Sequence, residues 1–290
     1  MQLLLQLLVN GIIKGAIYAI VAFGLAIIYR GMRVFHIAHG AVYVISCYLF
    51  YTFFHLLNLP LSLAVFFTFV VVAIIAVCIE VGVYKPLFKK EASSEIILIV
   101  SLALYVLIVN IIALFYGNET KMIFSEISSA ITFSGIVMTH IQLIQLIISL
   151  LAFTGIYLMI KQTNIGRAIT AMADNNFLAE VIGIDIWRLR MIMITIGSLL
   201  AAIAGILVSS DVGMDPWSGM SMLLAGAVAM IIGGVEKWEG ALVGGLLLGI
   251  LQALAIWKLS ARWQDTVTFL VLFIFLLFKP EGILSSKKRV

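Results

Sequence analysis

The sequence predicts an all-α protein, a polytopic helical bundle that crosses a membrane about nine times, within a range of about eight to ten. Of its 290 residues, 63% are hydrophobic and 11% are charged, whereas a soluble domain carries about 25% charged residues. The mean hydropathy is +1.20, and the apolar residues form long uninterrupted runs. Such a chain cannot hide its apolar surface from water, so we expect it to reside in lipid.

Nine apolar runs define the expected helices. A spanning helix needs about 20 mostly apolar residues, and in hydrocarbon every backbone polar group must be bonded within its own segment. Strands of this length are therefore excluded, and we expect a single transmembrane domain over residues 1–290. The runs cover residues 3–29, 38–56, 61–84, 95–116, 140–160, 189–210, 219–235, 238–257 and 263–279.

Basic residues gather in alternate breaks between these runs, and cytoplasmic loops retain Lys and Arg. Counting through nine spans puts the basic breaks on one side, with Lys121, Lys258 and Arg262 as exceptions. We therefore expect the N-terminus outside and the C-terminus in the cytoplasm. The basic breaks hold Arg30 and Arg33; Lys85, Lys89 and Lys90; Lys161, Arg167, Arg188 and Arg190; and Lys279, Lys287, Lys288 and Arg289.

Several kinds of chemistry are not expected. The chain has no Gly-rich phosphate loop with Lys-Ser/Thr, and so no ATP site of its own. It also has no HExxH sequence or Ser-His or paired-Asp arrangement, so we expect no catalytic residue and no bound cofactor. The basic residues lie in short loops rather than in one stripe, which argues against a nucleic-acid partner.

Small residues at helical spacing predict close helix packing, because they let backbones approach each other in lipid. Three Gly-x3-Gly pairs carry this signal: Gly11 with Gly15, Gly240 with Gly244, and Gly245 with Gly249.

The largest hydrophilic stretch, residues 161–190, has the composition of a short ordered helix rather than a loop. Its alanines favour helix, Asp174 or Asn175 can cap a second short helix, and Gly183 can end it. One interpretation is a solvated connector. The other is a docking helix that fits a groove on a cytoplasmic ATPase.

The chain resembles a known family, the branched-chain amino acid permeases of ABC importers of LivH/LivM type. The resemblance covers nearly the whole chain and depends on the order and spacing of several motifs. These are Asn10-Gly11 with Gly15-Ala-Ile-Tyr-Ala and Gly24-Leu25; Ile37-Ala-His39-Gly40; Glu80-x3-Tyr84-Lys-Pro-Leu87; Arg167-Ala168 with Asp174, Ala179 and Gly183-Ile-Asp185; Gly233-Gly234 with Gly240-Ala and Gly244-Gly245-x3-Gly249; and Lys279-Pro280-Glu-Gly282-Ile-Leu284.

The resemblance implies a permease subunit, not an enzyme, in a bacterial cytoplasmic (inner) membrane, where it moves branched-chain or related amino acids by alternating access. It implies two cytoplasmic ATP-binding cassette subunits that hydrolyse ATP with Mg²⁺, a second related permease subunit in a homo- or heterodimer, and an extracytoplasmic solute-binding protein, all among membrane lipids. It also implies that the cytoplasmic loop at about 161–190 is the coupling helix region, with Arg167, Ala168, Ala171, Asp174, Ala179, Gly183 and Asp185 as the coupling residues.

Alternatives remain open. The same class of importer can carry urea, short amides or another small solute, and a secondary transporter or a channel is a different answer. His36, Gln252, Leu224 and Glu236-Lys237 depart from the family pattern, which bears on the substrate rather than on the fold.

Polar residues inside the apolar runs are candidates for function. We expect Glu80, near Lys85, to form an interfacial ion pair or to be a snorkelling carboxylate. We expect Lys14 to be either an interfacial anchor or directed at a neighbour or polar cavity. His36 and His39 share a helical face, but no Asp, Glu or Cys completes a metal site around them, so we expect no metal. Either the two histidines bond the helix ends at a bend, or they line a pathway with Gly40 and Asn110.

Overall fold

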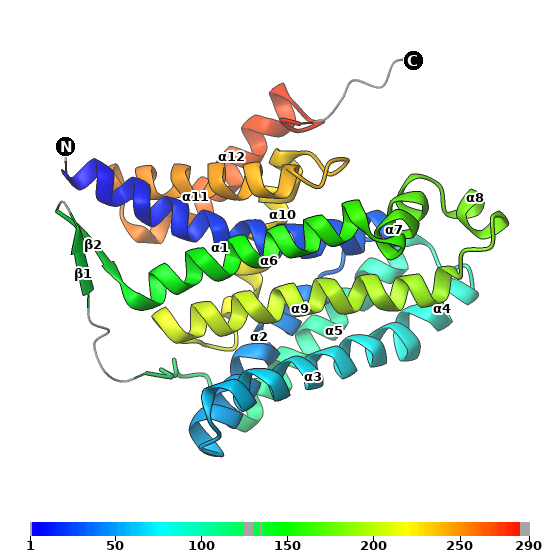
Figure 1. Cartoon of the computed structure of the whole chain (residues 1–290), viewed down its shortest axis with the longest axis horizontal. Helices are drawn as coiled ribbons and strands as arrows, with labels where there is room; N and C mark the ends of the chain where they lie inside the picture. Colours follow the sequence, from blue (N-terminus) through cyan, green and yellow to red (C-terminus); the bar gives the residue numbers. More distant parts are fainter. Residues whose placement is uncertain (1, 125–129, 134, 285–290) are drawn as a thin grey trace. The chain divides into compact units, whose positions relative to one another are not determined.

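The computed structural model describes residues 2–124, 130–133 and 135–284, and most of these residues are helical (Figure 1). Their contacts group the chain into two compact units. Unit 1 comprises Met1–Ala26, Phe124–Phe153 and Ser221–Val290, and unit 2 comprises Ile27–Ile123 and Thr154–Met220. The prediction of one transmembrane domain over the whole chain stays a prediction.

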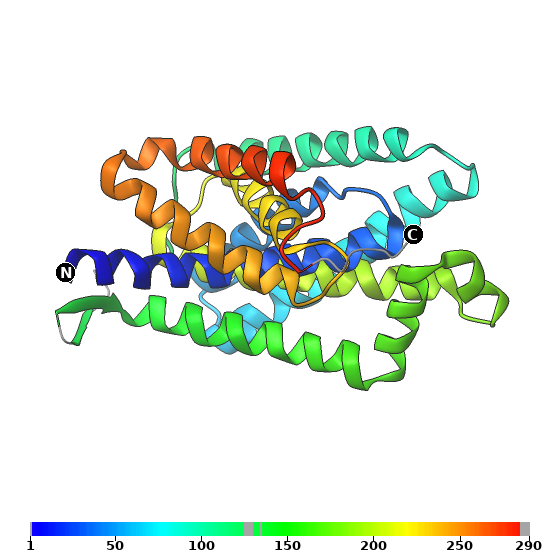
Figure 2. The same cartoon turned by 90° about the horizontal axis from the view of Figure 1, so that it is seen from above.

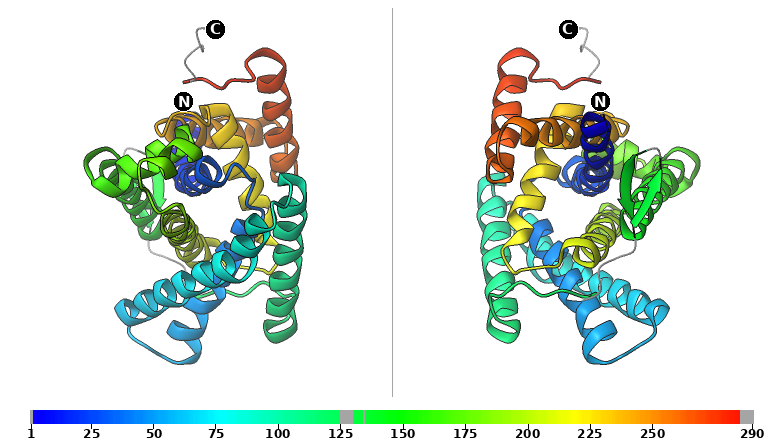
Figure 3. Two further views of the ribbon diagram at one scale, coloured as in Figure 1. Left: turned by 90° about the vertical axis from the view of Figure 1, so that its right-hand side faces the viewer. Right: turned by 90° about the vertical axis from the view of Figure 1, so that its left-hand side faces the viewer.

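Unit 1 contains most of α1 (Gln2–Met32), a β-hairpin, and the C-terminal helices. The hairpin pairs β1 (Ala130–Phe133) with β2 (Ile136–Thr139) in antiparallel register, Ala130 opposite Thr139. Figures 2 and 3 show the last helix crossing α11 at an angle. The remaining elements are the first part of α6 (His140–Gln162), most of α10 (Ser218–Gly233), α11 (Gly240–Lys258), the short 3₁₀ helix η3 (Ala261–Trp263) and α12 (Gln264–Phe278).

Unit 2 is built around α2 (Ala38–Tyr51), which packs against α9, α3 and α5 (Figure 3). Most side chains of α2 are buried, so this helix forms the core of the unit. The surrounding elements are η1 (Thr52–Leu56), α3 (Leu61–Ile79), η2 (Glu80–Tyr84), α4 (Lys85–Lys89), α5 (Ser94–Tyr116), α7 (Asn164–Asp174), α8 (Asn176–Val181) and α9 (Ile186–Val212), together with the ends of α1, α6 and α10.

Every apolar run coincides with a helical segment, and among the described residues six helices are long and apolar enough to cross a membrane. The chain is thus a polytopic helical membrane protein, while the count of nine spans and the orientation stay predictions. Lys287, Lys288 and Arg289, which contribute to the predicted orientation, lie outside the described residues. The six are Gln2–Met32, Leu61–Lys89, Ser94–Tyr116, His140–Gln162, Ile186–Val212 and Gly240–Lys258; Ser218–Gly233 and Gln264–Phe278 are apolar but shorter.

The break expected from Lys85-Pro86 onward begins later than expected, because the helix that begins at Leu61 continues to Lys89, and residues 90–93 separate it from α5. Glu80–Tyr84 forms a π-turn, in which the Lys85 N–H bonds the carbonyl of Glu80. Proline lacks an N–H and crowds the preceding turn of an ordinary α-helix. Pro86 is the second residue after the π-turn and lies in the first turn of α4, where a proline is tolerated.

Residues 117–139 form the break between the apolar runs at 95–116 and 140–160, and they include the hairpin. The side chain of Gln6 on α1 clamps the second strand: its Nε2 donates to the carbonyl of Val137 at 2.8 Å, and its Oε1 accepts from the Val137 N–H at 2.8 Å. Figure 2 shows the hairpin beside the first turns of α1. Residues 125–129 and 134 of this stretch are outside the described part.

The segment after α12 caps the C-terminal end of α10. The N–H groups of Ile283 and Leu284 donate to the carbonyls of Ile232 and Gly233 at 2.8 and 3.1 Å. Gly282 has a φ of +83°, and a Cβ there would lie 2.4 Å from the Cα of Gly234. The segment thereby satisfies carbonyls that the end of a helix leaves without intrahelical partners.

Candidate functional site: the α7–α8 segment and the buried polar network

The segment from α7 to the start of α9 is ordered by three successive side-chain caps. Thr163, Asn175 and Asp185 accept from the N–H groups of Gly166, Leu178 and Arg188 at 3.0, 3.1 and 3.1 Å. Each cap satisfies an N–H that the first helical turn leaves free. The expectation of a second short helix is confirmed, with Asn175 rather than Asp174 as its cap. Gly183, with a φ of +89°, turns the chain after α8 as expected.

The seven predicted coupling residues lie on both faces of this segment. Ala179 is buried, and Ala168 and Ala171 are half-buried. Arg167, Asp174, Gly183 and Asp185 are exposed. Three of the four have local partners: Arg167 bonds Asn164, Asp185 forms an ion pair with Arg188 at 3.0 Å, and Asp174 lies 3.9 Å from Arg30. Their role in coupling stays a prediction.

The end of α1 holds the junction between α7 and α8. The Arg33 guanidinium donates to the carbonyl of Ala173 at 2.5 Å, and the Asn176 amide donates to the carbonyl of Gly31 at 3.5 Å. Both carbonyls lie at helix C-termini, where intrahelical partners run out and a cationic side chain is favourable. The segment is therefore fixed to the unit 2 part of α1 rather than loosely tethered.

Four large apolar side chains on and just after α8 are exposed. Phe177, Leu178, Val181 and Ile182 are 73%, 57%, 67% and 72% exposed. We call them the α8 apolar patch. Figures 1 and 2 show α7 and α8 at the end of unit 2 where α9 begins. A group of exposed apolar side chains beside charged residues is typical of a protein or membrane interaction surface.

A buried ion pair lies one turn into α9. Nε of Arg190 is 3.0 Å from Oε1 of Glu80, and the two side chains are 5% and 1% exposed. The guanidinium carbon also lies 3.5 Å from the centre of the Phe88 ring. Glu80 is thus in an ion pair, as one of the two expectations for it had it, but the pair is buried and its partner is Arg190 rather than Lys85; its position relative to the membrane interface stays a prediction. The pair is enclosed by α3, α4 and α9.

Tyr84, at the other end of the π-turn, joins three elements. Its hydroxyl donates to Oγ of Ser101 on α5 at 2.9 Å and lies 2.7 Å from Nδ1 of His36. Because this hydroxyl has one proton, Nδ1 of His36 carries its own and donates it to Tyr84. Oγ of Ser101 also accepts from the N–H of Ala38 at 3.0 Å, which caps the first turn of α2.

His36 lies in the break between α1 and α2, where burial, followed by the neighbouring His39, lowers its pKa to about 3. The centroids of the two imidazole rings are 6.0 Å apart, so the structure brings the two histidines together.

Gly40 is buried on α2, and a Cβ on Gly219 would lie 2.4 Å from the carbonyl oxygen of Gly40. Asn110 instead lies on an exposed face of α5 and donates to the carbonyl of Val106, one turn back, at 2.7 Å. A pathway role for the two histidines, Gly40 and Asn110 stays a prediction.

Lys14 is exposed on α1, so its side chain does not point into unit 1. Arg190 and Arg33 were counted only among the basic residues of the breaks and were not expected at this site. The sequence did contain one indication of the buried polar network. The Glu80-x3-Tyr84 spacing places two polar side chains on one helical face.

Replacing Ser101 by alanine should destabilise the protein by about 1–3 kcal/mol, because the Ala38 N–H and the Tyr84 hydroxyl would both lose a buried partner. Chemical unfolding in detergent measures the change. Asn110→Ala, on the exposed face of the same helix, is the matched control and should have little effect. Equal effects for the two variants would contradict the importance of the network.

The six predicted packing glycines form two close contacts in unit 1. A Cβ on Gly11 or Gly15 would lie 2.8 Å from the Cα of Ile250 or Leu246, so α1 crosses α11 with the backbones in contact. On the α11 side, the corresponding glycines are Gly245 and Gly249. Gly240 and Gly244 face the end of α10, and a Cβ on Gly244 would lie 1.9 Å from the carbonyl oxygen of Ala229.

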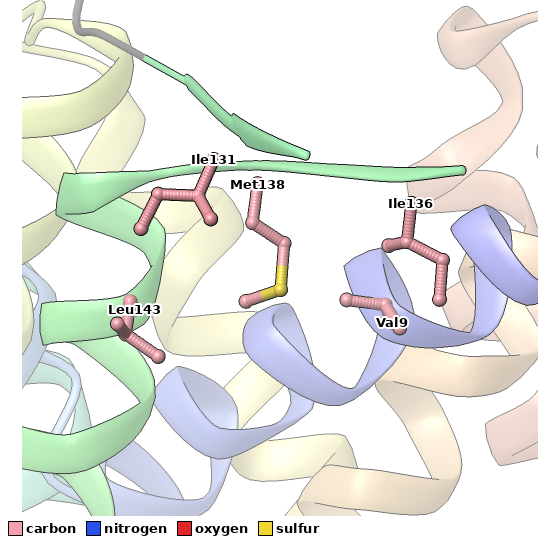
Figure 4. A pocket seen from close by; sticks show the side chains of 5 residues that line it. All are labelled: Val9, Ile131, Ile136, Met138 and Leu143. Carbon is pink, nitrogen blue, oxygen red and sulfur yellow. The ribbon is translucent and has the colours of Figure 1, made fainter. Parts of the chain in front are cut away.

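A cavity of about 150 Å³ lies in unit 1 between α1, the hairpin and α6 (Figure 4). Its lining side chains are Val9, Ile131, Ile136, Met138 and Leu143. None of them can bond the ammonium or carboxylate group of an amino acid. We therefore place the candidate site at the α7–α8 segment rather than at this cavity.

Comparison with known proteins identifies the family. The family described as "Branched-chain amino acid transport system / permease component" matches residues 7–276. The "High-affinity branched-chain amino acid transport system permease protein BraD" of Pseudomonas aeruginosa is 29% identical over 97% of this chain and 95% of its own length. The corresponding LivH protein of Escherichia coli is 30% identical over the same two shares, 97% and 95%.

Among solved structures, "PsaBC from Streptococcus pneumoniae in complex with Fab" superposes with a TM-score of 0.54 at 13% sequence identity, covering 94% of this chain and 91% of that chain. This match concerns the fold alone. The family resemblance expected from the motifs is confirmed by the family match and the curated relatives. The chain therefore belongs to the family of branched-chain amino acid transport system permease components.

Proposed function

We propose that this chain is the membrane-spanning subunit of an ATP-driven ABC importer that moves branched-chain or related amino acids into the cytoplasm by alternating access. ATP is hydrolysed on two cytoplasmic cassette subunits. An extracytoplasmic binding protein delivers the substrate, and a second permease subunit completes the pathway. Family membership and the names of the relatives support the transport class.

The observation that carries the proposal is the α8 apolar patch. A six-residue helix held by Asn175 and by the end of α1 leaves Phe177 on it, and Ile182 just after it, exposed. A short helix that inserts its apolar side chains into a groove is an established mode of recognition. In this proposal the groove belongs to the cytoplasmic ATPase, and Arg167 and Asp174 lie at the polar edge of the contact.

Truncating the patch should uncouple the importer. Phe177→Ala and Ile182→Ala should each weaken retention of the ATPase by about 30-fold or more if the two side chains are central anchors of the interface. The measurement is co-purification of ATPase from source membranes, followed by ATP-dependent uptake in proteoliposomes.

Val212→Ala is the matched control, because Val212 is 62% exposed at the opposite end of α9. It should retain both the ATPase and transport. A wild-type chain that purifies without any ATPase, or patch variants that transport at the wild-type rate, would contradict the proposal.

The substrate is tested separately. The purified binding protein and the reconstituted importer should bind and take up branched-chain amino acids in preference to urea and short amides. Preference for urea or an amide would leave the importer class intact and replace the substrate. Uptake driven by an ion gradient without ATP would instead identify a secondary transporter.

A further inference from the structure

We propose that the buried Glu80–Arg190 pair is a positioning element that passes movement of the α7–α8 segment through the π-turn to the start of α2. This inference rests on the proposed function, because it assumes that the segment is the point where a partner acts. It adds the internal route by which that action reaches the core helix of unit 2.

The first step is a stiff connection between α8 and α9. Only Ile182–Asp185 separate the two helices, and this turn folds back onto α8. The N–H groups of Gly183 and Ile184 donate to the carbonyls of Glu180 and Ala179 at 2.9 and 3.0 Å. Asp185 then caps α9. A displacement of α8 therefore reaches the first turn of α9 without a flexible linker to absorb it.

The second step is the contact that Arg190 makes with the helical stretch that runs from α3 to α4. Its guanidinium faces Glu80 at 3.0 Å on one side and the Phe88 ring at 3.5 Å on the other. Glu80 precedes α4 and Phe88 lies within it. Because one side chain contacts both ends of the η2–α4 stretch, α9 and that stretch must shift together or break the pair.

The third step runs through the π-turn. Glu80 and Tyr84 are its first and last residues, and π-turns inside α-helices occur frequently at functional sites. Tyr84 contacts both Ser101 and His36, and Ser101 caps the N–H of Ala38. A change of geometry at Glu80 is thereby passed to the point where the chain enters α2.

A purely static role explains the pair less well. Replacing a buried ion pair by apolar side chains of similar volume is often neutral or stabilising, so stability alone does not call for one. The contact also lacks hydrogen-bond geometry: within the described residues, both carboxylate oxygens of Glu80 and the Nε and Nη2 atoms of Arg190 are buried and make no hydrogen bond, so the 3.0 Å approach is an ion pair alone. A pair held without aligned hydrogen bonds can be remade in a second arrangement more readily than a fully bonded one.

The test separates stability from transmission with the double variant Glu80→Met/Arg190→Met, which replaces both charges with apolar side chains. The complete importer, with its ATPase and binding protein, is reconstituted in proteoliposomes, and uptake and ATP hydrolysis are measured together. We expect the ATPase to remain bound and active while solute moved per ATP falls at least about fivefold, within the range of measured coupling between sites.

Thr68→Val is the matched control, since Thr68 is a buried polar residue of α3 whose hydroxyl donates to the carbonyl of Ala64 on its own helix. It should leave the transport-to-hydrolysis ratio unchanged. Wild-type coupling in the double variant would overturn the inference. Loss of the ATPase from the wild-type chain would overturn the proposed function instead.

If the double variant does not fold, Tyr84→Phe provides the second test. It keeps the ring and removes the hydroxyl that joins Ser101 and His36. A lowered transport-to-hydrolysis ratio supports the route, whereas an unchanged ratio at wild-type stability overturns it.

Discussion

Replacing Arg190 alone by methionine should destabilise the protein by about 3–5 kcal/mol, because removing one member of a buried ion pair leaves the other charge unpaired in a dry environment. Glu80 is 1% exposed on its side chain and has Arg190 as its ion-pair partner. The variant also loses the contact between the guanidinium and the ring of Phe88.

Unfolding by SDS titration in mixed micelles measures this change, with tryptophan fluorescence as the readout. The double variant Glu80→Met/Arg190→Met is the control, and it should recover most of the lost stability because no charge is left unpaired. A single variant as stable as the wild type, or a double variant less stable than the single one, would show that the pair is not buried in the way the structure shows.

Substituting Gly249 by valine should cost about 3 kcal/mol or more, at the upper end of the range for overpacked sites. A Cβ on this glycine would lie 2.4 Å from the carbonyl oxygen of Gly11, 2.4 Å from the N of Gly15 and 2.5 Å from its Cα. All three atoms are backbone, so no rotamer change relieves the clash. The two helices must move apart, and the van der Waals contacts that hold them in lipid are lost.

The same substitution at Gly155 on α6 is the control, since a Cβ there would meet no atom of the described residues within 4 Å. Thermal unfolding of the purified variants in detergent should show a large loss for Gly249→Val and a small change for Gly155→Val. Similar melting temperatures for the two variants would mean that α1 and α11 do not touch at this glycine.

The helices could be predicted from the sequence because the constraint that produces them is local. In hydrocarbon every backbone group must be bonded within its own segment, so an apolar run of sufficient length becomes a helix whatever its neighbours are. The predicted run at 95–116 corresponds to the helix Ser94–Tyr116, and the run at 140–160 corresponds to the helix His140–Gln162. The caps at Asn175 and Asp185 are local for the same reason.

The buried network could not be predicted in this way. The pairing of Glu80 with Arg190 depends on how α3 and α9 pack, and the two residues are far apart in the sequence. Arg190 was counted among the loop cations because composition cannot tell a basic residue at a helix start from one in solvent. Similarly, small-residue spacing predicted close helix contacts but not which glycines face one another. The hairpin was missed because four-residue strands give a weak periodic signal.

The segment that caps α10 has a consequence for the order of synthesis. The carbonyls of Ile232 and Gly233 receive their partners from Ile283 and Leu284, which the ribosome makes only after α11 and α12 are complete. Until then, two carbonyl acceptors at the end of α10 lack these donors. The hydrogen bonding of α10 is therefore completed only after α11 and α12 have been made. A nascent or truncated chain that stops short of Ile283 would therefore expose an incomplete helix end to membrane quality control.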